Sequence, residues 1–157
     1  LGLRSYIKAR EEELLDKQGV CVATGAFRHL PCLQGRNTEG FWHLRKEAIN
    51  SPIQGLAAAV TGSAMIDCEG ALLKEYGLSY VDYQTALLNS PKENLNMPLL
   101  INEVHDEILF DVPTDNLKCS IELITDTMEN VPTLRKLVPD LKFKFKTKMV
   151  IGDCWSK

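Results

Sequence analysis

The chain has 157 residues, of which 45% are hydrophobic and 25% are charged, and its formal net charge is −3. This length and composition fit one globular domain or part of one, and the mild acidity excludes a nucleic-acid binder that works through bulk positive charge. The longest apolar run is far shorter than the roughly 20 residues that cross a bilayer, so no membrane partner is expected.

The five cysteines are widely spaced and form no C-x-x-C pair. This pattern predicts neither a disulfide framework nor a zinc site, and it indicates a reducing compartment. The first residues lack the apolar core of a secretory signal, and the absence of an initiator Met suggests a processed or excised piece. The expected location is therefore intracellular.

The first part of the chain predicts a helix followed by a bent β-ribbon. Residues 3–17 carry apolar residues with charges between them, and Gly19 is a plausible stop. The stretch 20–24 is β-branched enough for a strand, Gly25 supplies a turn, and 27–31 returns along the strand.

A long central helix is predicted after a polar loop over 32–40. Residues 41–48 favour a short helix of their own. Ser51 and Pro52 then resemble the start of a new helix, with Ser as N-cap and Pro at the first helical position. The run that follows is rich in Ala, Leu and Met and extends to Gly77. Its small residues predict a buried helix that other backbone can approach closely.

A β-hairpin is predicted after the mixed segment 78–97, which ends in a loop containing Asn and Pro. The runs 98–104 and 108–112 are strand-like, and the short polar stretch between them predicts a tight turn. Three ionisable residues would therefore lie at the tip of a hairpin whose strands are apolar.

The last part of the chain predicts a helix and a strand. Thr114 or Asp115 is expected to cap a helix that ends near Met128. Residues 141–150 alternate strictly, which predicts a strand with a lysine face. The lysines of 142–148 favour a solvated strand face or a blunted sheet edge over phosphate contacts.

These elements together predict an α+β fold, with a long central helix and flanking helices packed on an antiparallel sheet. The sequence contains no internal repeat and no low-complexity tract. The acidic run Glu11–Glu13 is expected on a solvated helix face.

The hairpin tip carries the candidate chemistry. Asp106 and Glu107 are hard oxygen ligands of the kind that Mg²⁺ prefers, since this ion binds one or two carboxylates and fills its other sites with water and substrate phosphates. His105 is a good hydrogen-bond donor to a phosphate or sugar oxygen. The alternative is an ordinary polar turn, because Asp and His are common turn residues.

Several separated motifs resemble family A DNA polymerases, the bacterial DNA polymerase I type. In chain order they are TGAFRHLP (24–31), AINSPIQG (48–55), VHDE (104–107) and VIGDCWSK (150–157). This is also their order in the family, and the resemblance runs from near residue 1 to Trp155. Agreement of several motifs is more specific than any one of them.

The resemblance implies roles for the hairpin residues in template-directed nucleotidyl transfer. Asp106 would be a ligand of the catalytic Mg²⁺ pair, Glu107 a nearby carboxylate that tunes the site, and His105 a contact to the primer end. Two-metal phosphoryl transfer needs such carboxylates to hold the ions.

The resemblance also implies DNA contacts upstream of the hairpin. Asn50 and Gln54 would reach the minor groove of the primer-template duplex, where every correct pair presents similar acceptors; their alternative role is at a helix start. The family has an Arg just before this segment, where this chain has Arg45 and Lys46. Lys46, alone or with Arg45, would take over its contact to a phosphate or the minor groove. In the ribbon, Ala26 and Phe27 replace residues that are usually basic in the family, and Arg28 is the basic residue that remains.

The resemblance covers only part of a polymerase core. It implies that residues 1–45 end the fingers subdomain and that 46–157 form the C-terminal part of the palm. The family's first acidic motif and its dNTP-binding helix would lie upstream, in cis or on a separate chain, so this chain alone is expected to be inactive. Asp82 begins a fragment that imitates the missing motif, but a polar residue in an insertion is the favoured interpretation.

Two other functions remain open from the sequence. The chain could be a non-catalytic palm remnant that binds DNA or a partner protein, because some acidic and basic family positions are lost, as in Leu56–Ala59. A small metal-dependent nuclease would need a second acidic cluster, which is not found. The departures suggest a divergent phage or organellar branch.

Overall fold

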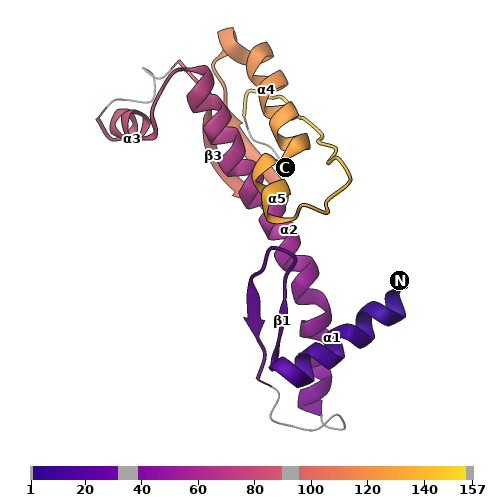
Figure 1. The fold of residues 1–157 in the computed structure, drawn as a ribbon. Helices are drawn as coiled ribbons and strands as arrows, with labels where there is room; N and C mark the ends of the chain where they lie inside the picture. Colours follow the sequence, from indigo (N-terminus) through magenta and orange to yellow (C-terminus); the bar gives the residue numbers. More distant parts are fainter. Residues whose placement is uncertain (1, 32–38, 90–95, 155–157) are drawn as a thin grey trace. The chain divides into compact units, whose positions relative to one another are not determined.

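The computed structural model describes residues 2–31, 39–89 and 96–154. Its elements in chain order are α1 (Leu3–Lys17), β1 (Gly19–Cys21), β2 (Phe27–His29), α2 (Glu39–Glu75), α3 (Tyr80–Asn89), β3 (Leu99–Val104), β4 (Glu107–Asp111), the 3-10 helix η2 (Thr114–Asn116), α4 (Leu117–Asn130) and α5 (Pro132–Leu137) (Figure 1). The strands form two antiparallel pairs, β1–β2 and β3–β4. The predicted α+β class with a long central helix is confirmed.

The chain packs as two compact units. The first comprises Leu1–Val60 and Leu137–Pro139, and the second comprises Thr61–Lys136 and Asp140–Lys157. Helix α2 belongs to both units because it continues without a break through residue 60. The expected boundary between the fingers and palm subdomains, at 45/46, is a functional division and not a division by compactness. It stays a prediction.

The first unit has a core between α1, the β1–β2 ribbon and the N-terminal part of α2. Helix α1 covers the predicted residues, but it ends with Gln18 in the left-handed conformation, at φ 52°, rather than at Gly19. The buried cluster consists of Leu14, Val20, Leu30, Phe41 and Ala48. Removing these side chains from water is the main force that holds the three elements together.

The predicted ribbon is confirmed, and two glycines allow its close packing. Gly25 turns the chain with φ +89°. An added Cβ at Gly19 would lie 2.3 Å from the Phe27 ring, and one at Gly55 would lie 2.8 Å from the Val22 side chain. Glycine at these positions therefore lets the two strands pair and lets α2 approach the ribbon.

The prediction of two helices meeting at Ser51 is wrong. Residues 41–48 belong to the same helix as the rest of α2, and Pro52 lies inside it. The Ser51 hydroxyl donates to the Glu47 carbonyl, 2.6 Å away, as it does within a continuous helix. An interior Pro costs about 3 kcal/mol. Burial of this part of α2, including Ala48, offsets that cost.

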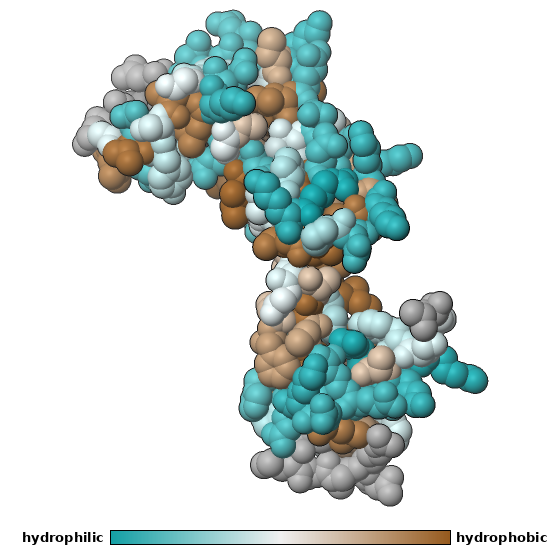
Figure 2. Space-filling view, viewed as in Figure 1, coloured by the Kyte–Doolittle hydropathy of each residue, from teal (hydrophilic) through white to brown (hydrophobic). Residues whose placement is uncertain are grey.

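By length and composition alone, the Gly40–Glu75 part of α2 is long and apolar enough to cross a membrane. A helix of this length and hydropathy was not predicted from the sequence, because uninterrupted apolar runs were the only signal considered. Figure 2 shows apolar side chains on the middle of α2, where Ile53 and Ile66 are more than half exposed. A mostly buried core helix of a globular protein passes the same test, but here only 28% of the apolar stretch is buried. The predicted burial of the helix therefore holds only in part, at residues such as Leu72 in the core of the second unit.

The second unit has its own core beneath α2, α3, β3 and α4. Its buried cluster consists of Cys68, Leu72, Leu73, Tyr83, Met97, Leu99 and Ile124. Burial, with the charge of Asp67 adding to it, raises the pKa of the Cys68 thiol to about 12. Cys68 is therefore an unreactive core residue. Helix α2 ends before Gly77, at φ +64°, as predicted.

Helix α3 lies in the segment 78–97, to which the sequence analysis assigns no function. Its start is fixed by a reciprocal pair, in which the Asp82 backbone N–H donates to the Ser79 hydroxyl oxygen at 3.2 Å and the hydroxyl donates to the Asp82 carboxylate. This is a helix-capping arrangement. It gives Asp82 a local structural role. The loop predicted at 32–40 and the end of 78–97 lie largely outside the described residues.

The prediction that Thr114 or Asp115 caps the next helix is wrong. Both residues lie in η2, and Asn116 occupies the N-cap position of α4 without a side-chain cap bond. The Asn116 amide instead donates to the Asn96 carbonyl at 2.9 Å. A longer-range contact therefore uses the side chain that would have capped the helix.

The prediction of a strand at 141–150 is also wrong. These residues form no regular secondary structure, and the alternation of burial is only partial. Leu141, Phe145 and Thr147 are half-buried, whereas Phe143, Met149 and the lysines are exposed. Side chains of Arg135 and Glu129 take up part of the backbone hydrogen bonding that a neighbouring strand would supply.

Candidate functional site

The hairpin that carries the candidate site has the predicted topology. Strands β3 and β4 pair antiparallel, and the last pair is Val104 with Glu107. His105 and Asp106 therefore form a two-residue turn. Directly opposed residues share one face of an antiparallel pair, so Glu107 lies on the face of Val104 while Asp106 lies at the tip. The other end of β3 is anchored by Leu99, which is buried in the core.

His105 has a left-handed backbone, with φ 61°. Two-residue hairpin turns require a positive φ at the first turn position, where Gly or Asn is usual. A side chain in this region costs roughly 1–2 kcal/mol. The positive φ is what a turn of this type requires, so it explains the backbone conformation and by itself assigns no function to His105.

The tip presents its polar atoms to solvent. His105, Asp106 and Glu107 are all exposed, and within the described part of the chain no hydrogen bond or ion pair holds their side chains. The carboxylate oxygens of Asp106 and Glu107 and the ring nitrogens of His105 are therefore available to a ligand. Among residues 2–31, 39–89 and 96–154, no group of three or more His, Cys, Asp or Glu side chains could hold a metal ion by itself.

The predicted minor-groove residues lie in the first unit, on α2. Asn50 and Gln54 are both exposed and four residues apart, hence on one helical face. Lys46, also four residues before Asn50, is exposed and belongs to the same face. The Tyr6 hydroxyl of α1 donates to the Ile49 carbonyl at 2.8 Å, which ties α2 to α1 beside Asn50.

Two predicted DNA contacts have partners within the first unit. Arg45 forms an ion pair with Glu11 of α1, and its guanidinium lies 5.3 Å from the centre of the Trp42 ring. Arg28 of β2 forms an ion pair with Glu47 of α2 at 3.2 Å. Both side chains therefore fasten elements to α2, which the sequence did not predict.

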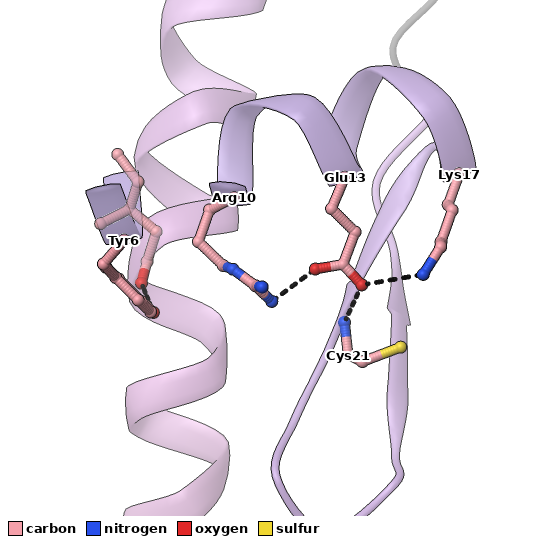
Figure 3. Close-up of polar contacts among 6 residues, drawn as sticks. Tyr6, Arg10, Glu13, Lys17 and Cys21 are labelled. Atoms are coloured by element: carbon pink, nitrogen blue, oxygen red, sulfur yellow. Dashed lines mark hydrogen bonds and ion pairs between the residues drawn. The ribbon is translucent and has the colours of Figure 1, made fainter. Parts of the chain in front are cut away.

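The expectation of a solvated acidic run in α1 is wrong for two of its three residues. Glu11 is bound to Arg45, and Glu13 accepts a hydrogen bond from the Cys21 backbone N–H at 3.2 Å (Figure 3). Glu13 also pairs with Arg10 and with Lys17. Only Glu12 extends into solvent, with 60% of its side chain exposed.

A sequence signal for this network exists. Tyr6, Arg10, Glu13 and Lys17 follow one another at helical spacing, so they form one stripe along α1. Burial raises the pKa of the Glu13 carboxyl, but hydrogen bonds from Cys21 and the charges of Arg10 and Lys17 outweigh burial and hold the pKa below its ordinary value of 4.5. The ionised carboxylate is thus what fastens α1 to β1.

Comparison with known proteins identifies the relatives of the chain. The family model described as DNA polymerase family A matches residues 1–157. DNA polymerase I of Rhizobium leguminosarum is 32% identical over 140 residues, which are 88% of this chain and 12% of that protein. DNA polymerase I of Bacillus caldotenax is 31% identical over 134 residues, 85% of this chain and 13% of that protein. The chain therefore spans about one eighth of the length of these relatives.

A solved structure shows a similar fold. It is the POL domain of Pol1 from M. smegmatis in complex with DNA primer-template and dNTP. The match has a TM-score of 0.62 and 26% identity, and it covers 82% of this chain and 19% of that one.

Proposed function

The chain belongs to DNA polymerase family A, and from this membership we propose that it supplies one part of a polymerase active site and works with a further segment upstream. The observation that carries the proposal is the hairpin turn, in which Asp106 is exposed at the tip and Glu107 sits in the adjoining pair. The reaction is template-directed transfer of a nucleotide from dNTP to a primer end.

The donor set of the hairpin fits Mg²⁺. Asp106 would be the metal ligand, and Glu107 would assist it, because Mg²⁺ takes only one or two carboxylates and completes its shell with water and substrate phosphates. When bound, the ions supply stabilisation of the charge on the attacking primer oxygen and on the leaving pyrophosphate. Two-metal transfer needs more carboxylates than these two, and the proposal assigns the remaining ligands to the upstream segment.

The remaining site residues would position the DNA. His105, beside the metal ligand, would donate a hydrogen bond to the primer end. Asn50 and Gln54 would contact acceptors of the minor groove from one face of α2, with Lys46 providing a cation on the same face. Arg45 and Arg28 would contribute only after release from their carboxylate partners, so their contribution would be the smallest.

The partners that follow are primer-template DNA, dNTP and the upstream polymerase segment, in cis or as a separate chain. Without that segment the chain would not extend a primer, since the two strands of the hairpin carry no Lys or Arg to bind a triphosphate. The proposed location is the cytoplasm of a bacterial or phage-infected cell, or an organelle.

The test is primer extension by the complete polymerase carrying Asp106→Asn. This change keeps the size of the side chain but removes the charge, so extension should fall by at least about a hundredfold while primer-template binding stays within a few-fold. The matched control is Asp111→Asn, at the far end of β4 and also exposed. It should extend primers at the normal rate. Near-normal extension by Asp106→Asn would favour a non-catalytic remnant.

A further inference from the structure

The segment 141–148 is held against α4 and α5 by contacts to every second residue. The Arg135 guanidinium donates to the carbonyls of Leu141 at 2.9 Å and Phe143 at 2.8 Å. The Phe145 N–H donates to the Glu129 carbonyl at 3.3 Å, and the Thr147 N–H donates to the Glu129 carboxylate at 3.4 Å. The odd-numbered positions are thus tied down by their backbone.

The even-numbered positions form a row of cations, defined as Lys142, Lys144, Lys146 and Lys148. All four are exposed, and no hydrogen bond or ion pair with a described residue engages them. The rings of Phe143 and Phe145, which alternate with these lysines, pack edge to face with centroids 5.1 Å apart. The row is thus four exposed charges on a segment whose backbone is held by hydrogen bonds to Arg135 and Glu129.

The spacing and charge of this row suit a nucleic-acid backbone. Alternate residues of an extended chain are at most about 7 Å apart, so the row spans at most about 20 Å. One strand of duplex DNA presents a phosphate every 3.4 Å or so of helix axis, about six over that length. Lysine binds phosphate as a flexible point charge, so exact registry is unnecessary.

We propose that the row Lys142, Lys144, Lys146 and Lys148 binds the phosphate backbone of the DNA on which the hairpin acts. This inference rests on the proposed function and adds a binding surface to it. The row and the hairpin turn belong to the same compact unit. Protection of a sheet edge is the other use of such lysines, but residues 141–150 form no strand in the described structure.

The test is the salt dependence of primer-template affinity in the complete polymerase. The quadruple variant K142Q/K144Q/K146Q/K148Q changes the formal charge of the chain from −3 by four units to −7. Each lost phosphate contact lowers the slope of log K against log salt by about 0.9, so the slope should fall by up to about 3.6. The pair K144Q/K146Q should lose about half as much.

The matched control is K8Q/K74Q/K118Q/K136Q, which makes the same charge change at four exposed lysines outside the row. Its slope should stay within about one unit of the wild-type slope. Equal slopes for both quadruple variants would assign the effect to bulk charge and overturn the proposal. An unchanged salt slope in the row variants would also overturn the proposal. The binding of the same variants to phosphatidylserine vesicles is measured in parallel, and loss of vesicle binding without loss of DNA affinity would overturn it as well.

Failure of this inference is separable from failure of the proposed function. An unchanged salt slope together with loss of extension in Asp106→Asn would reject the lysine row alone. A reduced slope together with normal extension by Asp106→Asn would retain the DNA-binding row and reject the catalytic assignment.

Discussion

Asp67 of α2 accepts two hydrogen bonds from Thr133, one from the backbone N–H at 2.9 Å and one from the hydroxyl. Thr133 is the second residue of α5, where backbone N–H groups have no partner inside the helix. The carboxylate therefore caps a helix that lies 66 residues further along the chain. It also fixes the start of the helix that carries Arg135, which holds the segment of the lysine row.

Replacing Asp67 by Ala should lower the free energy of unfolding of the second unit by about 2 kcal/mol, because two charge-assisted hydrogen bonds are lost. Asp67→Asn keeps one acceptor and should cost less. Urea unfolding followed by circular dichroism measures the change. Glu122→Ala, at an exposed position of α4, is the control and should stay within about 0.5 kcal/mol of the wild type. If Asp67→Ala matches this control, the cap contributes nothing.

The lowered pKa of Glu13 predicts a pH-dependent contribution to the stability of the first unit. A carboxyl whose pKa is lower when folded stabilises the fold in its ionised form. The stabilisation is fully present above the ordinary value of 4.5 and is lost as the pH falls through the lower folded value. Glu13→Gln should therefore be less stable than wild type at pH 7, and the difference should shrink at about pH 3.

Urea midpoints of both proteins at the two pH values measure this effect. Glu12→Gln is the matched control, because the Glu12 side chain next to Glu13 is largely exposed and, among the described residues, forms an ion pair with Lys8 alone. The midpoint difference for Glu12→Gln should be small at both pH values. A Glu13→Gln difference that stays constant with pH would contradict the role of the ionised carboxylate.

Two substitutions separate the backbone of His105 from its side chain. His105→Gly removes the strain of the left-handed conformation, so stability should be unchanged or higher by up to about 1 kcal/mol. His105→Ala keeps the strain and should be less stable than the Gly variant. Both variants lack the imidazole, so both should extend primers more slowly in the complete polymerase. Normal extension by His105→Gly would show that the backbone, and not the ring, is what the site requires.

Pro52→Ala tests whether Pro52 lies inside one continuous helix, α2. Alanine restores an N–H inside α2, so the thermal midpoint should rise. The free energy of unfolding should increase by no more than about 3 kcal/mol. Thermal melts monitored by circular dichroism measure it, with Ala57→Ser as a control at an exposed position of the same helix. A lower midpoint would mean that the packing of α2 depends on the shape that Pro52 gives it.

The sequence predicted those elements whose signals are local. The hairpin follows from two strand-like runs that flank a polar turn, and α1 follows from its spacing of apolar residues. The boundary at Ser51 and Pro52 was predicted wrongly because a start signal and an interior Pro look alike when the packing of the preceding residues is unknown. The prediction of a strand at 141–150 was wrong because alternation of apolar and polar residues indicates only which side chains are buried. A β-strand also needs a neighbouring strand to pair with.

The candidate site was predictable in part. The prediction that His105 and Asp106 lie in the turn is confirmed by the register of the hairpin, but Glu107, also predicted at the tip, is the first residue of β4. The assignment of metal and DNA contacts came from the resemblance to a family, and it stays a prediction. The ion pairs of Arg45 and Arg28 could not be predicted, since their partners are 34 and 19 residues away in the chain.

The register of the hairpin also limits how its length can vary. Leu100 pairs with Phe110 but Asn102 pairs with Leu109, so Ile101 is an extra residue that a bulge absorbs. One residue added at the turn would move the side chains of one strand to the opposite face. Insertions and deletions should therefore be tolerated near Ile101 and not between Val104 and Glu107, even where single substitutions in that turn leave the protein folded.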